Sequence, residues 1–84
     1  MKTIYKYQLT HDGISMPKGA KFLHVALQVG LGTMWFEVET DEEEIEERHF
    51  VIVGTGHPVP TGDVKYLGTY FQDIFVWHVY EVRT

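Results

Sequence analysis

The sequence predicts an all-β domain, mostly antiparallel, built as a compact sandwich or open barrel of about six strands with little or no helix. Apolar and polar residues alternate along most of the chain, which is the two-residue period of a strand. Clusters of Gly, Pro and Asp interrupt this alternation at short intervals, as turns do. No segment has the 3.6-residue apolar period of an amphipathic helix. The 84 residues are enough for a single domain over 1–84.

The strand pattern occurs in six segments, and a short extended piece at 14–16 stops at Pro17. The six expected strands are residues 3–9, 21–29, 33–39, 48–53, 66–71 and 74–82. In the third of these, alternation places Met34 and Phe36 in the core and Trp35 on the outside. In the second, alternation places Leu23 and Val25 on one face.

The last expected strand, at 74–82, is apolar on both faces. Trp77 and Val79 lie on one side, and Val76 and Tyr80 on the other. Such a strand is either central and covered by its own chain, or it lies at a subunit interface. A homo-oligomer is therefore expected, since a chain this short and without cysteine has few other ways to add stability.

Acidic residues are concentrated in one part of the chain. Eight of the 12 lie between Glu37 and Glu47. The rest of the chain therefore carries only 4 acidic residues beside all 7 Lys and Arg residues. The net charge of −5 argues against duplex nucleic acid, which needs a basic face. The run 41–47 is expected to be a solvated acidic loop or one frayed helical turn. A site for a metal or a cationic partner is the alternative, although a calcium loop would need alternating ligands and a central glycine.

Composition also limits the cellular setting. The chain has no cysteine, and no apolar stretch reaches the roughly 18 residues that span a bilayer. The first nine residues alternate, whereas a signal peptide needs a continuous apolar stretch. We therefore expect a cytoplasmic protein with no membrane partner.

The longest interruption of the strand pattern is the Gly/Pro loop at 54–63. It begins with Gly54, Thr55, Gly56, His57 and Pro58. Glycines permit close approach of the backbone to a ligand, and prolines stiffen the frame. Amides from Gly54 to His57 could cup an anion, with the Thr55 hydroxyl and the His57 ring adding hydrogen bonds. The alternative is a rigid turn that only closes the fold.

No group of side chains supports catalysis. The five histidines contain no i, i+2 or i, i+4 pair of the kind that marks a metal site, and Ser15 is the only serine. The carboxylates cluster in one run instead of facing one another across a cleft. A non-enzymatic protein with no catalytic residue, no metal and no cofactor is expected. Its many aromatic residues are either core or a surface on which bases stack.

Four sequence blocks are distinctive: MKTIYKY at 1–7, MPKGAK at 16–21, RHFVIVGTGHPVP at 48–60 and VWHVYEV at 76–82. With them the chain resembles a small family of uncharacterised phage and prophage proteins, a domain of unknown function. The resemblance implies a phage source, and small phage proteins without catalytic groups often counteract host defence.

In that setting we expect a phage-encoded binding protein, in the host cytoplasm, that sequesters a small anionic nucleotide-like signal at a subunit interface. The loop residues 54–58 would orient the ligand, Trp35 or Tyr70 would stack on it, and Arg48 would pair with phosphate. Lys65 and Arg83 are further candidates for phosphate contacts. Two alternatives are a protein-binding inhibitor of a host defence enzyme that uses the acidic segment 41–47, and a phage structural or assembly accessory protein.

Overall fold

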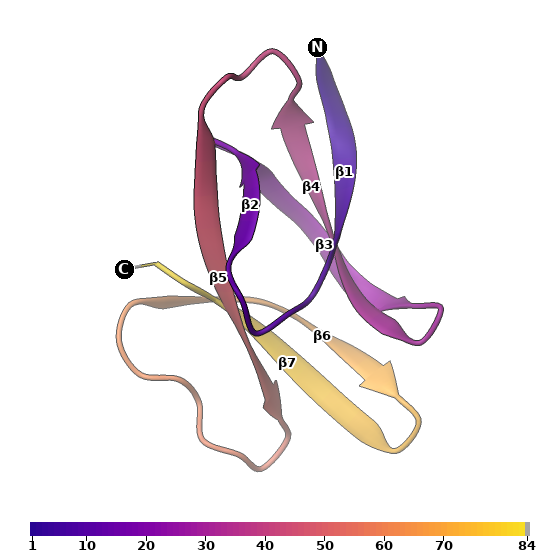
Figure 1. Cartoon of the computed structure of the whole chain (residues 1–84). Coiled ribbons are helices and arrows are strands. Elements are labelled where there is room, and N and C mark those ends of the chain that lie inside the picture. Colours follow the sequence, from indigo (N-terminus) through magenta and orange to yellow (C-terminus); the bar gives the residue numbers. More distant parts are fainter. Residues whose placement is uncertain (84) are drawn as a thin grey trace.

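The computed structural model describes residues 1–83, and within them it contains seven β-strands and no helix (Figure 1). The strands are β1 (Lys2–Gln8), β2 (Ile14–Pro17), β3 (Lys21–Gln28), β4 (Leu31–Glu39), β5 (Ile45–Gly54), β6 (Val64–Gln72) and β7 (Phe75–Val82). The all-β prediction is confirmed. The short piece expected at 14–16 is a paired strand, β2, so that the strands number seven. In the described part of the chain, nothing helical is long and apolar enough to traverse a lipid bilayer.

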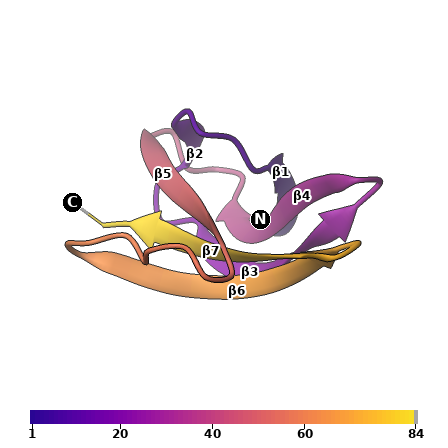
Figure 2. The ribbon, with the colours of Figure 1, turned by 90° about the horizontal axis from the view of Figure 1, so that it is seen from below.

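The strands form two antiparallel sheets, ordered β1-β4-β3 and β2-β5-β7-β6. Figure 2 shows the two sheets curving around one interior, with β3 beside β6. No ladder joins β3 to β6, so the strands form an open, barrel-like sandwich and not a closed barrel. Gly68 of β6 permits the close approach of β3 and β6, because a Cβ at this position would lie 2.7 Å from Cγ1 of Val25.

The hydrophobic core surrounds Phe36 of β4, whose side chain is completely buried. Its ring makes edge contacts with Tyr7, Phe22 and Phe50, at centroid distances of 5.7, 5.6 and 6.1 Å. Phe50 comes from the other sheet, so these rings tie the two sheets together. Met34 is also fully buried, which confirms the alternation predicted for β4.

A bulge in β3 changes which residues of that strand face the core. The pairing with β4 shifts register between Phe22 and His24, so one extra residue is inserted at Leu23. Phe22 and Val25 both pack into the core, whereas Leu23 is 41% exposed. The prediction that Leu23 and Val25 share a face is therefore wrong, because the extra residue of a bulge reverses the alternation.

The loop formed by the acidic run at 41–47 is shorter than the sequence predicts, because part of the run belongs to a strand. Residues 41–44 form the exposed connection between β4 and β5, but β5 begins at Ile45 and includes Glu46 and Glu47. Pairing with β2 explains this earlier start, because Met16 lies opposite Glu46 and Ser15 opposite Glu47. Two carboxylates of the run are therefore held in a sheet.

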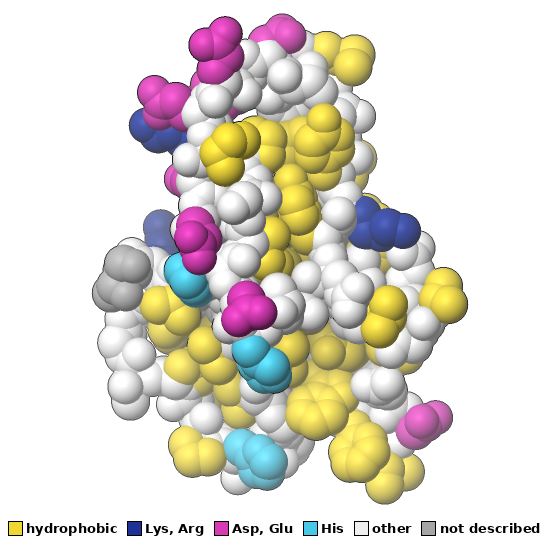
Figure 3. Space-filling view, in the orientation of Figure 1, with side chains coloured by type: hydrophobic (Ala, Val, Ile, Leu, Met, Phe, Trp, Pro, Cys, Tyr) yellow, Lys and Arg dark blue, Asp and Glu magenta, His cyan; other side chains and the backbone are white. Residues whose placement is uncertain are grey.

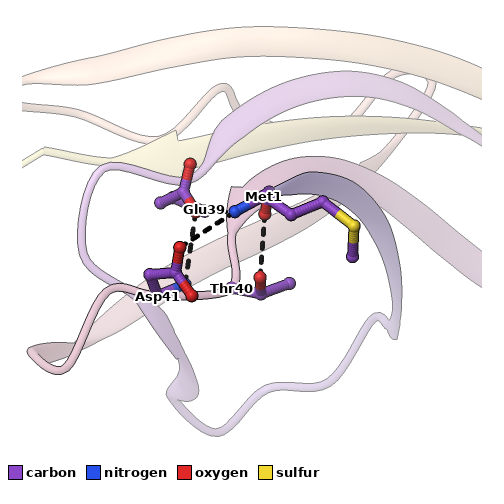
Figure 4. Close-up of polar contacts among 4 residues, drawn as sticks. All are labelled: Met1, Glu39, Thr40 and Asp41. Carbon is purple, nitrogen blue, oxygen red and sulfur yellow. Dashed lines mark hydrogen bonds and ion pairs between the residues drawn. The ribbon is translucent and has the colours of Figure 1, made fainter.

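The start of the acidic connection is tied to Met1, directly before the beginning of β1 (Figure 4). The α-amino nitrogen of Met1 lies 2.5 Å from Oε1 of Glu39 and 3.1 Å from Oδ2 of Asp41. The Thr40 hydroxyl donates to the Met1 carbonyl at 2.9 Å. These hydrogen bonds, first to Glu39 and then to Asp41, raise the pKa of the α-amino group.

Strand β7 is central, with β5 on one side and β6 on the other. Its inner face is buried at Val79, which is completely inaccessible to solvent, and at Glu81, and opens toward Phe75 at the start of the strand. On its outer face Val76, Tyr80 and Val82 are only half-buried. The central position thus explains one apolar face of this strand and leaves the other partly open.

Candidate functional site

The G-T-G-H-P segment forms a tight turn at the end of β5. The amide of His57 donates to the carbonyl of Gly54 at 3.1 Å, and Gly56 has a positive φ of 92°, as the third residue of a type II turn requires. The turn is fastened to β7, because the amide of Thr55 donates to the carbonyl of Val76 at 3.2 Å. The main chain of this segment is therefore fixed by its own hydrogen bonds.

A cleft of about 450 Å³ lies where this turn meets the first residues of β7. Its lining is largely apolar and consists of Gly54, Thr55, His57, Ile74, Phe75, Val76 and Trp77. Figure 3 shows hydrophobic side chains gathered at this lower end of the molecule, where β5 ends and β7 begins in Figure 1. Ile74 and Phe75 are 88% and 54% exposed, so the rim of the cleft presents apolar surface to solvent.

Gly54 lines the cleft between two aromatic rings, that of His57 on the turn and that of Trp77 on β7. A Cβ at Gly54 would lie 3.3 Å from Cζ3 of Trp77 and 3.5 Å from Nδ1 of His57. A side chain at this position would therefore press on the indole of Trp77 and reach ordinary contact distance from the His57 ring. Because Gly54 pairs with Trp77 across the β5–β7 ladder, the sheet register holds the indole in this place.

The indole of Trp77 is also oriented from its other end. Its Nε1–H donates to Oε1 of Gln72 at 3.3 Å, and Nε2 of Gln72 donates to the carbonyl of Gly30 at 3.4 Å. The ring of Phe75 stacks on the indole, with centroids 5.7 Å apart and planes 22° apart. Together Phe75 and Trp77 make a broad aromatic surface that is already positioned without a ligand.

Two amides of the predicted anion cup are not available to a ligand. The amides of Thr55 and His57 are both used within the fold, for the Val76 and Gly54 carbonyls. The Thr55 hydroxyl is used as well, since its oxygen lies 2.7 Å from Nε2 of His78. The His57 ring, by contrast, makes no hydrogen bond within residues 1–83 and is exposed. Gly56 lines a smaller neighbouring hollow of about 240 Å³, and Pro58 lines neither.

Arg48 is not placed to hold a phosphate at this cleft. It lies six residues from Gly54 along β5, which is about 20 Å in an extended strand. Its Nε and Nη2 donate to the two carboxylate oxygens of Glu81 at 2.6 and 2.8 Å, and Nη1 donates to the Ala20 carbonyl at 2.6 Å. The hydrogen bond to Glu81 raises the pKa of the guanidinium. The charge of Arg48 is thus already matched inside the fold.

The other proposed phosphate contacts, Lys65 and Arg83, do lie near Arg48. They line a separate hollow of about 420 Å³ together with three carboxylates, those of Glu46, Glu47 and Glu81. Acids and bases therefore balance around this hollow, which does not favour an anion.

Neither aromatic residue named from the sequence reaches the cleft. Tyr70 is 8% exposed and belongs to the core, where burial raises the pKa of its hydroxyl. Trp35 lies on β4 of the other sheet, with its ring 6.0 Å from that of His24. The cleft instead uses Phe75 and Trp77, and finding them would have required the β5–β7 register, because they are far from Gly54 in sequence.

The described residues contain no group of three His, Cys, Asp or Glu side chains arranged to hold a metal ion. No curated protein and no solved structure matches the chain. One family model does match, over residues 1–84. The chain belongs to that family, which is described as a domain of unknown function (DUF7352).

Proposed function

We propose that this chain is a non-enzymatic binding protein that holds a flat, weakly charged ring, such as a nucleobase, in the cleft between the Gly54–His57 turn and the start of β7. The observation that carries the proposal is the preformed aromatic surface of Phe75 and Trp77 beside the bare α-carbon of Gly54. A side chain at Gly54 would displace the indole of Trp77, which forms part of that surface.

The size and chemistry of the cleft support a small ring. A volume of about 450 Å³ falls in the lower part of the range for small-molecule sites, and its lining has few polar groups. A base stacked on an aromatic side chain gains about 1–3 kcal/mol whatever its sequence identity. The exposed ring of His57 supplies a hydrogen-bonding group at the edge of the same cleft.

The electrostatics of the cleft favour the ring over the phosphate of a nucleotide. None of the described lining residues is Lys, Arg, Asp or Glu. A phosphate attached to the ring would therefore remain in solvent, and affinity would depend little on its charge. This changes the expectation of an anion-selective site into a proposal for a ring-selective one.

We further propose that the source is a phage and that the ligand is a nucleotide-derived signal of the host, held so that it cannot reach its receptor. Sequestration requires only affinity, and a preformed apolar cleft meets that requirement without chemistry. The resemblance of the sequence to phage proteins supports this setting, and the aromatic cleft supports the ligand class.

Isothermal titration calorimetry with adenosine, guanosine, cytidine, uridine and cyclic diadenylate tests the proposal. We expect at least one of these probes to bind, and a 5′-phosphate on the preferred nucleoside to change its affinity less than threefold. If none of the five probes binds, or if phosphate is required for binding, the proposed ring site is wrong.

Two substitutions connect binding to the cleft. Gly54→Ala places a methyl group 3.3 Å from the Trp77 ring and is expected to abolish binding, while the ordinary φ of Gly54 lets the fold remain. Phe75→Ala removes one stacked ring and should weaken binding about 5- to 150-fold. The matched control is Leu31→Ala, because Leu31 is similarly exposed at the start of β4, away from the cleft. Equal affinities of the Phe75 and Leu31 variants would contradict the proposal.

The acidic connection supports a second candidate function, a docking site for a basic region of a host protein. Residues 41–44 are all exposed, and Figure 3 shows acidic side chains along the upper left of the molecule, away from the cleft. Lys18 pairs with Glu44 at 3.0 Å, whereas Glu42 and Glu43 form no ion pair within the described residues. If replacement of Glu42 and Glu43 by Gln leaves the biological effect of the protein unchanged, this second candidate is excluded.

A further inference from the structure

The outer surface of β5, β6 and β7 is unusual in its lack of charge. Within the paired segments, alternation directs outward the residues His49, Val51, Val53, Val64, Tyr66, Thr69, Phe71, Val76, His78, Tyr80 and Val82. None of these described residues is Lys, Arg, Asp or Glu. The charged side chains of the same strands face the other way, as Arg48 and Glu81 do, or lie at the border, as Glu47 does beside His49. An antiparallel sheet that faces water on one side normally carries polar residues there.

The Gly/Pro loop covers only one end of this outer surface. Val53 is 8% exposed although it lies outside the core cluster, because the loop forms a hollow over it that also includes Val59 and Tyr80. Away from the loop the side chains are accessible, and Tyr66 and Phe71 are 53% and 69% exposed. Most of the surface is thus apolar and uncovered.

The polar groups at the centre of this surface bond to one another. The Tyr66 hydroxyl contacts Oγ1 of Thr69, which lies 2.9 Å from Nδ1 of His78. On the other side of the ring, Nε2 of His78 lies 2.7 Å from Oγ1 of Thr55. The two ring nitrogens of His78 therefore each have a threonine hydroxyl as partner, and the Thr55 hydroxyl also lies 3.5 Å from the Val76 carbonyl.

Each side chain in this hydrogen-bonded series, from Tyr66 through Thr69 and His78 to Thr55, thereby has a partner within the fold. A buried polar group is costly only when it lacks a hydrogen bond. An apolar partner can therefore cover these four side chains without leaving their hydrogen-bonding groups unsatisfied, whereas the Tyr80 hydroxyl, which makes no hydrogen bond within residues 1–83, needs a partner from the other molecule or from solvent.

We propose that the partner is a second copy of this chain, packed sheet to sheet on the outer surface of β5, β6 and β7. Two copies of a protein with a net charge of −5 repel each other over most of their surfaces. A two-fold contact brings each surface against its own equivalent, so a surface without charge is the one place where like charges do not meet. Two antiparallel sheets pack face to face in this way at about 30°.

The size of the surface sets the strength of the contact. Three strands of about seven residues cover about 23 Å by 14 Å, or roughly 300 Å² in flat projection for each copy. A stable interface usually buries about 800 Å² of accessible surface per partner. The dimer is therefore of the weak, concentration-dependent class, and it forms without a ligand in the neighbouring cleft.

Sedimentation velocity over a concentration series, without added ligand, tests the dimer. The wild-type sedimentation coefficient should rise with concentration from the monomer value toward the dimer value. Phe71→Lys adds a charge at an exposed position of the surface and should hold the protein monomeric at every concentration. Ile4→Lys is the matched control, because Ile4 is 58% exposed on β1 of the other sheet, and this variant should associate like the wild type.

Three outcomes would overturn the proposal: a wild type that stays monomeric at its highest soluble concentration, a Phe71→Lys variant that still associates, or an Ile4→Lys variant that does not. Amide spectra of the wild type on dilution give a check that needs no variant. Shifts are expected at Val51, Tyr80 and Val82, and shifts confined instead to β1 would place the contact elsewhere. A negative result leaves ligand binding in the cleft unaffected, since no ligand is present in either experiment.

Discussion

The Arg48–Glu81 ion pair should make a single carboxylate essential for stability. The two side chains are 17% and 11% exposed, form a bidentate pair, and lie beside the core ring of Phe36, 5.0 Å from the guanidinium carbon. Glu81→Gln removes the bidentate partner and leaves the largely buried guanidinium with only the more exposed Glu46, 3.6 Å from Nη1. The expected cost is therefore about 3 kcal/mol, the lower end of the range for breaking a buried pair. A domain of 84 residues has about 4–13 kcal/mol of stability in total, so most of the margin is at risk. A loss of 3 kcal/mol corresponds to a fall of about 12–24 °C in Tm.

Urea unfolding of Glu81→Gln beside Glu44→Gln measures this effect. Glu44 is the matched control, because it pairs with Lys18 at 3.0 Å but both side chains are well exposed, and such a pair contributes less than about 1 kcal/mol. The double variant Arg48→Met/Glu81→Leu removes both charges and should recover most of the lost stability. The reasoning is refuted if Glu81→Gln costs no more than Glu44→Gln, or if the double variant is less stable than Glu81→Gln alone.

Three further predictions concern stability. Gly68→Ala places a Cβ 2.7 Å from Val25 and should cost about 1–3 kcal/mol of stability in chemical denaturation. Adding Val25→Ala should recover part of this loss, and no recovery would mean that the two sheets do not meet there. Burial raises the pKa of Tyr70, so its contribution to stability is complete below about pH 10, the pKa of the unfolded chain, and is lost as pH rises through the pKa of the folded protein. Tyr70→Phe should therefore flatten the fall in Tm at alkaline pH. An unchanged fall would contradict this. Val29 has a positive φ of 48° ahead of Gly30 and is 94% exposed, so Val29→Asn should raise stability by about 1 kcal/mol, whereas a lower Tm would show that the turn needs valine.

The strands were predictable from the sequence because their signal is local. Alternation located every long strand and placed Met34 and Phe36 in the core. It failed where the sheet departs from a simple ladder. The bulge at Leu23 reverses the faces of β3, and the early start of β5 depends on its pairing with β2, neither of which alternation along one strand can reveal.

The candidate site was only half predictable for the same reason. Glycines and a histidine followed by two prolines mark a shaped turn, and Gly54, Thr55 and His57 do line the cleft. The aromatic half of the cleft lies next to Gly54 because Gly54 pairs with Trp77, and this pairing is a contact between distant parts of the chain. Residue type alone pointed to Arg48 as a phosphate ligand, and only the position of Glu81 shows that its charge is already used.

The central claim is that a flat ring binds against Trp77, and a titration followed through the indole N–H signals tests it most directly. The chain has two tryptophans, so the spectrum contains its own control. Addition of the preferred nucleoside should shift the signal of Trp77, which lines the cleft, and leave that of Trp35, on the other sheet, unchanged. A shift of Trp35 alone, or of neither indole with any of the probes, would contradict the account.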